Sequence, residues 1–187
     1  MQITAVILAG GRGMRMGGID KGLADYNGKA MVAHVFDRIQ PQVTQVIMNA
    51  NRNLDIYQQF GIQVVTDATN QFDGPLAGFQ AGLAYAKTEW VLTVPCDSPL
   101  LPLDLVERMS NAIRKSNALM AIARSSSGDH PVFCLLHTSL SDDLDTFLNE
   151  GQRRVSAWQY RHTPVFVDFA DEQAFTNINH PVEKSLP

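Results

Sequence analysis

The chain has 187 residues, of which 45% are hydrophobic and 18% charged, a size and composition typical of one α/β domain. Its net charge of −4 excludes the general basic surface that holds nucleic acid. No apolar run is long enough to cross a membrane, and the first residues lead into a strand without a secretion signal. We therefore expect a cytoplasmic protein that binds neither nucleic acid nor membrane. The only two cysteines, Cys96 and Cys134, favour neither a disulfide framework nor a zinc site.

Strand-like and helical patterns alternate along the chain. Apolar runs predict strands at 3–8, 43–48, 62–66, 90–94, 118–123, 132–136 and 165–169. Apolar residues at helical spacing predict helices at 31–39, 76–85, 103–109 and 138–149. This alternation predicts a three-layer, doubly wound α/β fold, with a mostly parallel sheet between two layers of helices. Because no linker or repeat interrupts it, we expect residues 1–187 to form a single domain.

A glycine-rich segment follows directly on the first predicted strand. It contains five glycines and three cations within residues 8–21: Gly10, Gly11, Gly13, Gly17, Gly18, Arg12, Arg15 and Lys21. Without Cβ atoms, successive glycine N–H groups can turn toward one anion, and the cations can neutralise a polyphosphate. An ordinary surface turn needs only one or two glycines. The segment therefore predicts a site for the phosphates of a nucleotide.

This segment fits neither of two well-known nucleotide-binding loops. A P-loop requires Gly-Lys-Ser/Thr, but Lys21 lies between Asp20 and Gly22. The dinucleotide fingerprint requires a third glycine where this chain has Met16. The pattern that remains at 10–21, GG-xxx-RMGG-x-DK, resembles the nucleotidyltransferases and, among them, the molybdenum cofactor guanylyltransferase family.

Polar residues follow four of the predicted strands, where ligands of parallel α/β sheets bind. They are segment 10–21, residues 49–51, Asp67 and residues 95–99. Asp97 is the candidate Mg²⁺ ligand, because Mg²⁺ on a triphosphate needs only one or two protein carboxylates. The alternative is that Asp97 caps the following helix. In the family that the chain resembles, the acid of this Pro-Cys-Asp sequence is the magnesium ligand.

The resemblance implies nucleotide contacts at six positions: Leu8, Ala9, Gly10, Lys21, Asn49 and Asp67. We add Gly11 and Gly13 of the glycine-rich segment. The Asp67 carboxylate can accept two hydrogen bonds from guanine, although aspartate after a strand also commonly forms a turn. In the Gly-Pro-Leu-Ala-Gly sequence at 74–78, Gly78 either contacts the nucleotide or lets a helix pack closely on the sheet.

The resemblance places acceptor contacts in the distal part of the chain. Arg154 lies in a Gly-x-Arg-Arg-Val sequence, which we predict to be helical, and Asn177 and Asn179 form an Asn-x-Asn sequence. Arg153 and Arg154 would point to different sides of a helix, so that only one need face the acceptor. The family usually has threonine where this chain has His180. We expect residues of about 1–100 to bind the nucleotide and 101–187 the acceptor.

The resemblance implies transfer of GMP from GTP to the phosphate of molybdopterin, with release of pyrophosphate. Lys21, Arg15 and Asp97 would be catalytic through positioning and charge neutralisation, because the acceptor phosphate is largely dianionic at neutral pH and needs no base. The expected cofactor is Mg²⁺. The expected partners are GTP, molybdopterin, a molybdenum-inserting protein and recipient apo-oxidoreductases. We expect the chain to be a monomer that binds the protein partners transiently.

Two alternatives stay open. One is a cytidylyltransferase acting on molybdopterin or on a sugar or polyol phosphate, although Asp67 and the end of the glycine-rich segment favour guanine. The other is a carrier that binds GTP or the cofactor without catalysis. The absence of Gly-Lys-Ser/Thr argues against a GTPase switch.

Overall fold

A computed structural model describes residues 1–9, 20–68 and 74–178. Within these ranges, a seven-stranded sheet has the order β5-β4-β1-β6-β8-β7-β9. Its strands, in chain order, are β1 (Ile3–Leu8), β4 (Gln45–Asn49), β5 (Gln63–Val65), β6 (Trp90–Pro95), β7 (Met120–Ser125), β8 (Gly128–His137) and β9 (Val165–Asp168). Strand β8 is antiparallel to β6 and β7, and the other neighbouring strands are parallel. The mostly parallel sheet is confirmed.

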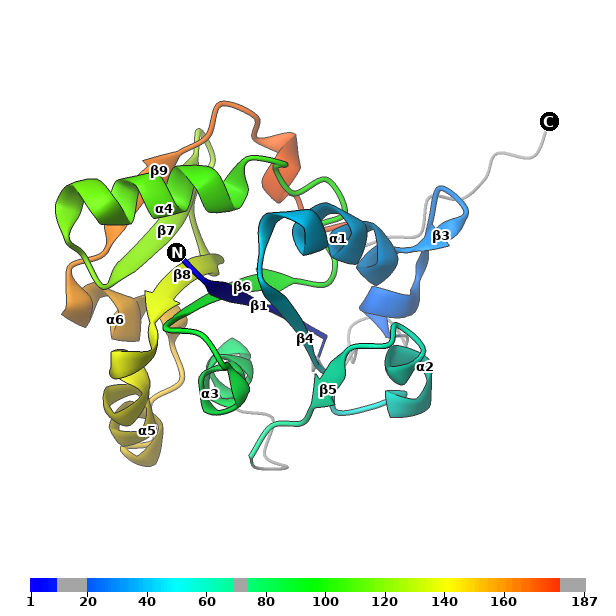
Figure 1. Ribbon diagram of the computed structural model, residues 1–187, viewed down its shortest axis with the longest axis horizontal. Helices are drawn as coiled ribbons and strands as arrows, with labels where there is room; N and C mark the ends of the chain where they lie inside the picture. Colours follow the sequence, from blue (N-terminus) through cyan, green and yellow to red (C-terminus); the bar gives the residue numbers. More distant parts are fainter. Residues whose placement is uncertain (10–19, 69–73, 179–187) are drawn as a thin grey trace.

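Helices cover both faces of this sheet (Figure 1). On one face lie α1 (Met31–Ile39) and α4 (Leu105–Ser116), and on the other lie α3 (Pro75–Tyr85), α5 (Ser141–Asn149) and α6 (Val155–Gln159). The predicted three layers are therefore confirmed. The short helix α2 (Leu54–Gln58) lies beside β5 (Figure 1).

Short elements complete the described chain. They are the hairpin β2 (Asp25–Tyr26) and β3 (Lys29–Ala30), and the 3₁₀ helices η2 (Lys21–Leu23), η3 (Gln40–Gln42), η4 (Thr138–Leu140), η5 (Tyr160–His162) and η6 (Gln173–Phe175). No helix among the described residues has the length and apolarity needed to cross a bilayer.

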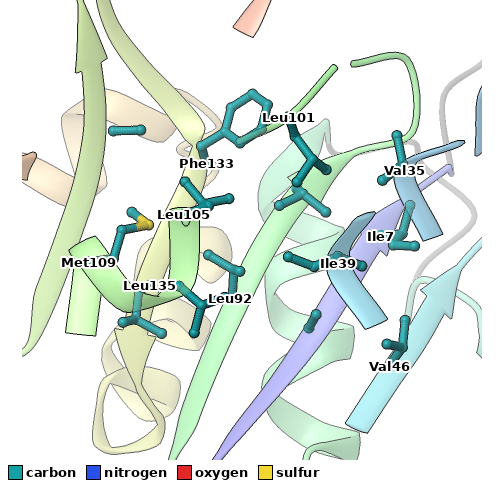
Figure 2. Packing of buried hydrophobic residues seen from close by; sticks show 14 of the residues in the cluster. Ile7, Val35, Ile39, Val46, Leu92, Leu101, Leu105, Met109, Phe133 and Leu135 are labelled. Atoms are coloured by element: carbon teal, nitrogen blue, oxygen red, sulfur yellow. The ribbon is translucent and has the colours of Figure 1, made fainter. Parts of the chain in front are cut away.

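The alternation of side chains along the strands produces two cores. On β1, Ile7 lies in the same core as Val35 and Ile39 of α1, and Val6 lies in the other core, with Phe79 of α3. Figure 2 shows the first core, in which Leu105 and Met109 of α4 and the preceding Leu101 lie over Leu92 of β6 and Leu135 of β8. Because both faces of the sheet are covered, its central strands β1 and β6 are mostly apolar, and the one threonine in each, Thr4 and Thr93, is buried.

The structure differs from the sequence prediction at several boundaries. The strand predicted at 132–136 is the second half of the longer β8, and the strand predicted at 118–123 begins and ends two residues later, as β7. Arg154 precedes α6 as its N-cap residue, so the prediction that Arg153 and Arg154 lie within a helix is wrong. Helix α2 was not predicted, because five residues are too few to show a helical period.

Candidate functional site

The parallel strands β4, β1 and β6 end at the same edge of the sheet. Leu8 pairs in register with Asn49 on one side and with Pro95 on the other. The backbone N–H of Ala9 donates to the carbonyl of Asn49 at 2.7 Å, and that of Cys96 donates to the carbonyl of Leu8 at 3.2 Å. The segments that follow these three strands therefore begin side by side, and they carry most of the predicted site residues.

Part of the predicted phosphate site lies outside the described residues. This applies to Gly10, Gly11, Gly13 and Arg15, whose roles stay predictions. Leu8 and Ala9, which lead into this segment, lie at the strand ends described above.

Lys21 and Asp97 come together at this edge. Lys21 begins η2, and its Nζ lies 3.5 Å from Oδ2 of Asp97. The Asp97 side chain is 10% exposed and that of Lys21 is 31% exposed, so the cation lies on the solvent side of the pair. Burial raises the pKa of Asp97, and the charge of Lys21 partly opposes this rise. The pair thus presents a shielded carboxylate and an accessible ammonium group.

Asp97 does not cap the following helix. Helix α4 begins at Leu105, and Asp104 occupies its N-cap position. The structure therefore excludes the capping interpretation of Asp97, and its role as the Mg²⁺ ligand stays a prediction.

A polar cluster of three residues lies at the ends of β4 and β5. Asn49 donates its Nδ2–H to Oδ1 of Asp67 at 2.9 Å, and Asn51 donates its Nδ2–H to Oδ2 of Asp67 at 2.7 Å. The backbone N–H of Asp67 donates to Oδ1 of Asn51 at 2.9 Å. These contacts fix the orientation of the carboxylate, and each oxygen of a carboxylate can accept a further hydrogen bond. Sequence reasoning gave Asn51 no role of its own, although its spacing of two residues from Asn49 places both on one side of an extended chain.

Gly78 allows α3 to approach this cluster. A Cβ atom at Gly78 would lie 2.6 Å from Oδ1 of Asn49 and 2.6 Å from Cδ2 of Leu8. The structure therefore supports the close-packing interpretation of Gly78. A contact between Gly78 and a nucleotide stays a prediction.

We expect Gly78→Ala to lower the free energy of unfolding by about 1–3 kcal/mol, because the added methyl group must displace Asn49 or Leu8. Urea denaturation measures this change. Asn49→Ala in the Gly78→Ala background should cost less than the sum of the two single changes, since it removes one of the clashing side chains. Wild-type stability of Gly78→Ala would contradict this account of the packing.

The candidate acceptor residue Asn177 docks next to Asp97. Ser98 donates its hydroxyl to Oδ1 of Asn177 at 2.9 Å, and the N–H of Ile178 donates to the carbonyl of Asp97 at 2.9 Å. Asn177 lines a cavity of about 130 Å³ together with Pro95, residues 129–133 and Phe175. The structure thus brings the distal part of the chain to the carboxylate at the end of β6.

The walls of this cavity are partly aromatic. The rings of His130 and Phe175 are stacked, with centroids 4.5 Å apart and planes 10° apart. Asp129, at the cavity edge, accepts a hydrogen bond from the Tyr160 hydroxyl at 2.7 Å. The cavity therefore offers both aromatic surface and a carboxylate.

The other two predicted acceptor residues are not placed in this cavity. The guanidinium group of Arg154 donates to the hydroxyl of Ser156 at 3.1 Å. The hydrogen bond to Asp129 raises the pKa of Tyr160, and the charge of Arg154 counters part of this rise. Asn179 lies outside the described residues.

The single carboxylate at Asp97 fits an Mg²⁺ ion that takes its other ligands from phosphates and water better than it fits a metal ion coordinated only by protein side chains. Among the described residues, no cluster of three or more histidine, cysteine, aspartate or glutamate side chains could hold a metal ion. Mg²⁺ prefers oxygen ligands and commonly takes most of them from phosphates and water. The single Asp97 carboxylate suits an ion that arrives with a triphosphate.

Comparison with known proteins shows the family of this chain. Residues 5–165 match the MobA-like NTP transferase domain. The chain belongs to this family. It is 49% identical to the molybdenum cofactor guanylyltransferase of Ralstonia nicotianae over 95% of this chain and 91% of that protein. It is 48% identical to the enzyme of the same name from Shewanella putrefaciens, over 98% of this chain and 95% of the relative. The chain is thus a nucleotidyltransferase, as the pattern at 10–21 predicted.

Solved structures of low sequence identity share the fold of this family. The molybdopterin-guanine dinucleotide biosynthesis protein A of Archaeoglobus fulgidus superposes with a TM-score of 0.77 at 20% identity, covering 96% of this chain and 93% of that chain. The 4-diphosphocytidyl-2C-methyl-D-erythritol synthase of Anaerococcus prevotii has a TM-score of 0.74 at 16% identity, covering 96% and 91%. Because one fold serves enzymes with different names, the base that is accepted must be decided by individual contacts.

Proposed function

We propose that this protein transfers GMP from GTP to the terminal phosphate of molybdopterin, giving molybdopterin guanine dinucleotide and pyrophosphate. The observation that carries the proposal is the buried Asp97 carboxylate paired with Lys21, with a polar cluster at the ends of β4 and β5 and the Asn177 cavity beside Asp97. The names of relatives up to 49% identical support the same reaction.

The strand order supports an arrangement of the two substrates. Read across the sheet, β5 and β4 carry the polar cluster, β1 leads into the glycine-rich segment, β6 leads to Asp97, and β8 lines the cavity. We place guanine against Asn49 and Asp67, the triphosphate along residues 10–21 and Lys21, and the acceptor in the cavity. Attacking and leaving oxygens of a phosphoryl transfer lie roughly in line through the phosphorus. We therefore propose that the acceptor approaches the α-phosphorus from the side opposite the pyrophosphate.

The chemistry requires little beyond positioning and charge. An oxygen of the acceptor phosphate forms a bond to the α-phosphorus, and the bond from that phosphorus to the leaving pyrophosphate breaks. A phosphate monoester is largely dianionic at neutral pH, so no protein base needs to remove a proton. Lys21 neutralises the charge that develops on the leaving oxygens, and Asp97 would hold Mg²⁺. The bound ion supplies further neutralisation of phosphate charge.

On the acceptor side, we propose that Asn177 orients the pterin part of the substrate. The hydrogen bond from Ser98 fixes its side chain in the lining of the cavity. The rings of His130 and Phe175 provide apolar surface for a flat heterocycle. In this proposal residues of about 1–100 bind the nucleotide and residues 101–187 the acceptor, within one domain. Arg154 and Asn179 stay candidate acceptor contacts.

Pyrophosphate release from purified protein tests the function. With Mg²⁺ and molybdopterin, GTP should release pyrophosphate, whereas CTP should release far less and omission of the acceptor should abolish release. A preference for CTP would identify a cytidylyltransferase. Binding of GTP without any release would identify a carrier.

Asp67→Asn tests the proposed recognition of guanine. An amide cannot accept hydrogen bonds at both of its terminal atoms, so we expect kcat/KM for GTP to fall about 10-fold or more while the value for ATP changes little. The ratio of the two kcat/KM values is the measurement, and Asp37→Asn, at an exposed carboxylate, is the control for loss of charge. An unchanged preference for GTP over ATP would refute the role of Asp67.

A further inference from the structure

Asp20, the residue before Lys21, is held by residues near helix α2. Tyr57 donates its hydroxyl to Oδ1 of Asp20 at 2.7 Å, and Asn53 donates its Nδ2–H to Oδ2 at 2.9 Å. The backbone N–H of Gly22 also donates to Oδ1, at 3.1 Å. Three uncharged donors, two from α2 and its N-cap residue and one from η2, therefore hold this one carboxylate.

The two side-chain donors each place a requirement on the local structure. Tyr57 is fully buried, and a buried hydroxyl without a partner is strongly unfavourable. Asn53 has a φ of 49°, in the left-handed region, which asparagine adopts more readily than most other residues with a Cβ atom. Helix α2, which presents both residues, has only five residues. The buried Tyr57 hydroxyl therefore depends on its hydrogen bond to Asp20, the residue directly before Lys21.

Gly22 shows how tightly this region is packed. A Cβ atom there would lie 2.7 Å from Oη of Tyr57 and 3.2 Å from Sγ of Cys96. Helix η2 therefore packs closely between α2 and the turn that carries Asp97. The backbone is fixed at both neighbours of Lys21, whose Nζ lies 3.5 Å from Asp97.

We propose that Tyr57 and Asn53 are positioning residues that act through Asp20 to hold Lys21 beside Asp97. A lysine side chain is long and flexible, so a fixed backbone reduces the ordering that remains when a substrate binds. Because the donors to Asp20 are uncharged, they hold its carboxylate without using a cation. This inference rests on the proposed function, since it assumes that Lys21 acts on a nucleotide.

Two variants test the proposal. Tyr57→Phe removes only the hydroxyl, and Asn53→Gly removes the amide while glycine keeps the left-handed backbone conformation without strain. We expect each to lower kcat for guanylyl transfer about tenfold, the effect of one hydrogen bond to a charged group, with KM for the acceptor unchanged. Thr4→Val is the matched control, because it removes a buried hydroxyl that bonds to Gln45 and Thr88 near the start of β1, at the opposite end of that strand from the site.

A double-mutant cycle separates positioning from a general loss of structure. In the Lys21→Ala background, Tyr57→Phe and Asn53→Gly should have little further effect on kcat or on the affinity for Mg²⁺–GTP. An equal fold-loss in both backgrounds would overturn the proposal, as would wild-type kcat for both single variants. If Thr4→Val lowered kcat as much as Tyr57→Phe at equal stability, the hydroxyl of Tyr57 would have no special role.

Calorimetry with Mg²⁺–GTP and no acceptor distinguishes this inference from the proposed function. Weaker GTP binding by both variants supports the positioning role even if the wild-type protein transfers no GMP, in which case only the proposed function fails. Normal GTP binding and transfer by both variants overturn the positioning role and leave the proposed function intact. Absence of GTP binding by the wild-type protein overturns both.

Discussion

Lys21→Ala is expected to slow guanylyl transfer at least about 100-fold, the usual effect of removing one group that stabilises developing charge. Lys21 is the described cation closest to Asp97, at 3.5 Å, and it starts the helix that follows the glycine-rich segment. Its side chain is 31% exposed, so its loss leaves no large cavity. We therefore expect the fold and its stability to be retained.

The measurement is pyrophosphate release with GTP, Mg²⁺ and molybdopterin, together with a urea unfolding curve. Lys115→Ala, at an exposed position near the end of α4, controls for the loss of one positive charge. Near-normal turnover by Lys21→Ala would show that the catalytic role assigned to Lys21 is wrong.

Asp97→Asn is expected to abolish most activity without lowering stability. Asparagine is a poor substitute for the carboxylate that would hold Mg²⁺, so transfer should fall at least about 100-fold. The substitution also removes a buried negative charge from the folded protein, and burial of that charge is unfavourable. The change therefore separates activity from stability.

The pH dependence of stability provides a second readout for this variant. Burial raises the pKa of Asp97 above its ordinary value of 3.8, so the folded state binds its proton more tightly than the unfolded chain. The resulting stabilisation is fully present below that ordinary value and is lost as the pH rises through the raised pKa. Asp97→Asn lacks this titration, and at neutral pH its free energy of unfolding should equal or exceed that of the wild type.

Unfolding curves between acidic and neutral pH test this expectation, with Asp37→Asn as a control at an exposed carboxylate. A large loss of stability in Asp97→Asn would show that the carboxylate supports the fold. Retained transfer activity would show that another group holds the metal.

Much of the fold could be predicted because its signals are local. The strand β1 was predicted with its observed bounds, since an apolar run that ends in glycines can be recognised from neighbouring residues alone. Where the prediction failed, the local signal was short or ambiguous. Helix α2 has five residues, and β8 begins with polar residues that carry no strand pattern.

Part of the site could be predicted for the same reason. Asp97 and Asp67 stand directly after apolar runs, and in a parallel sheet such positions share one edge. The partners of these residues were not predictable. Asn51 and Tyr57 lie 16 and 37 residues from the carboxylates that they hold, and no local pattern records a hydrogen bond over such distances.

The sequence by itself determined the alternation of strands and helices, the glycine-rich segment and the family to which the chain belongs, because each depends on residues close together in the chain. The tertiary structure alone decided that Asn177 lies against the turn of Asp97, that Gly78 makes room for Asn49, and that Asp20 is held by α2. These contacts form only when the apolar faces of the helices pack on the sheet, since that packing brings distant polar groups within hydrogen-bond distance.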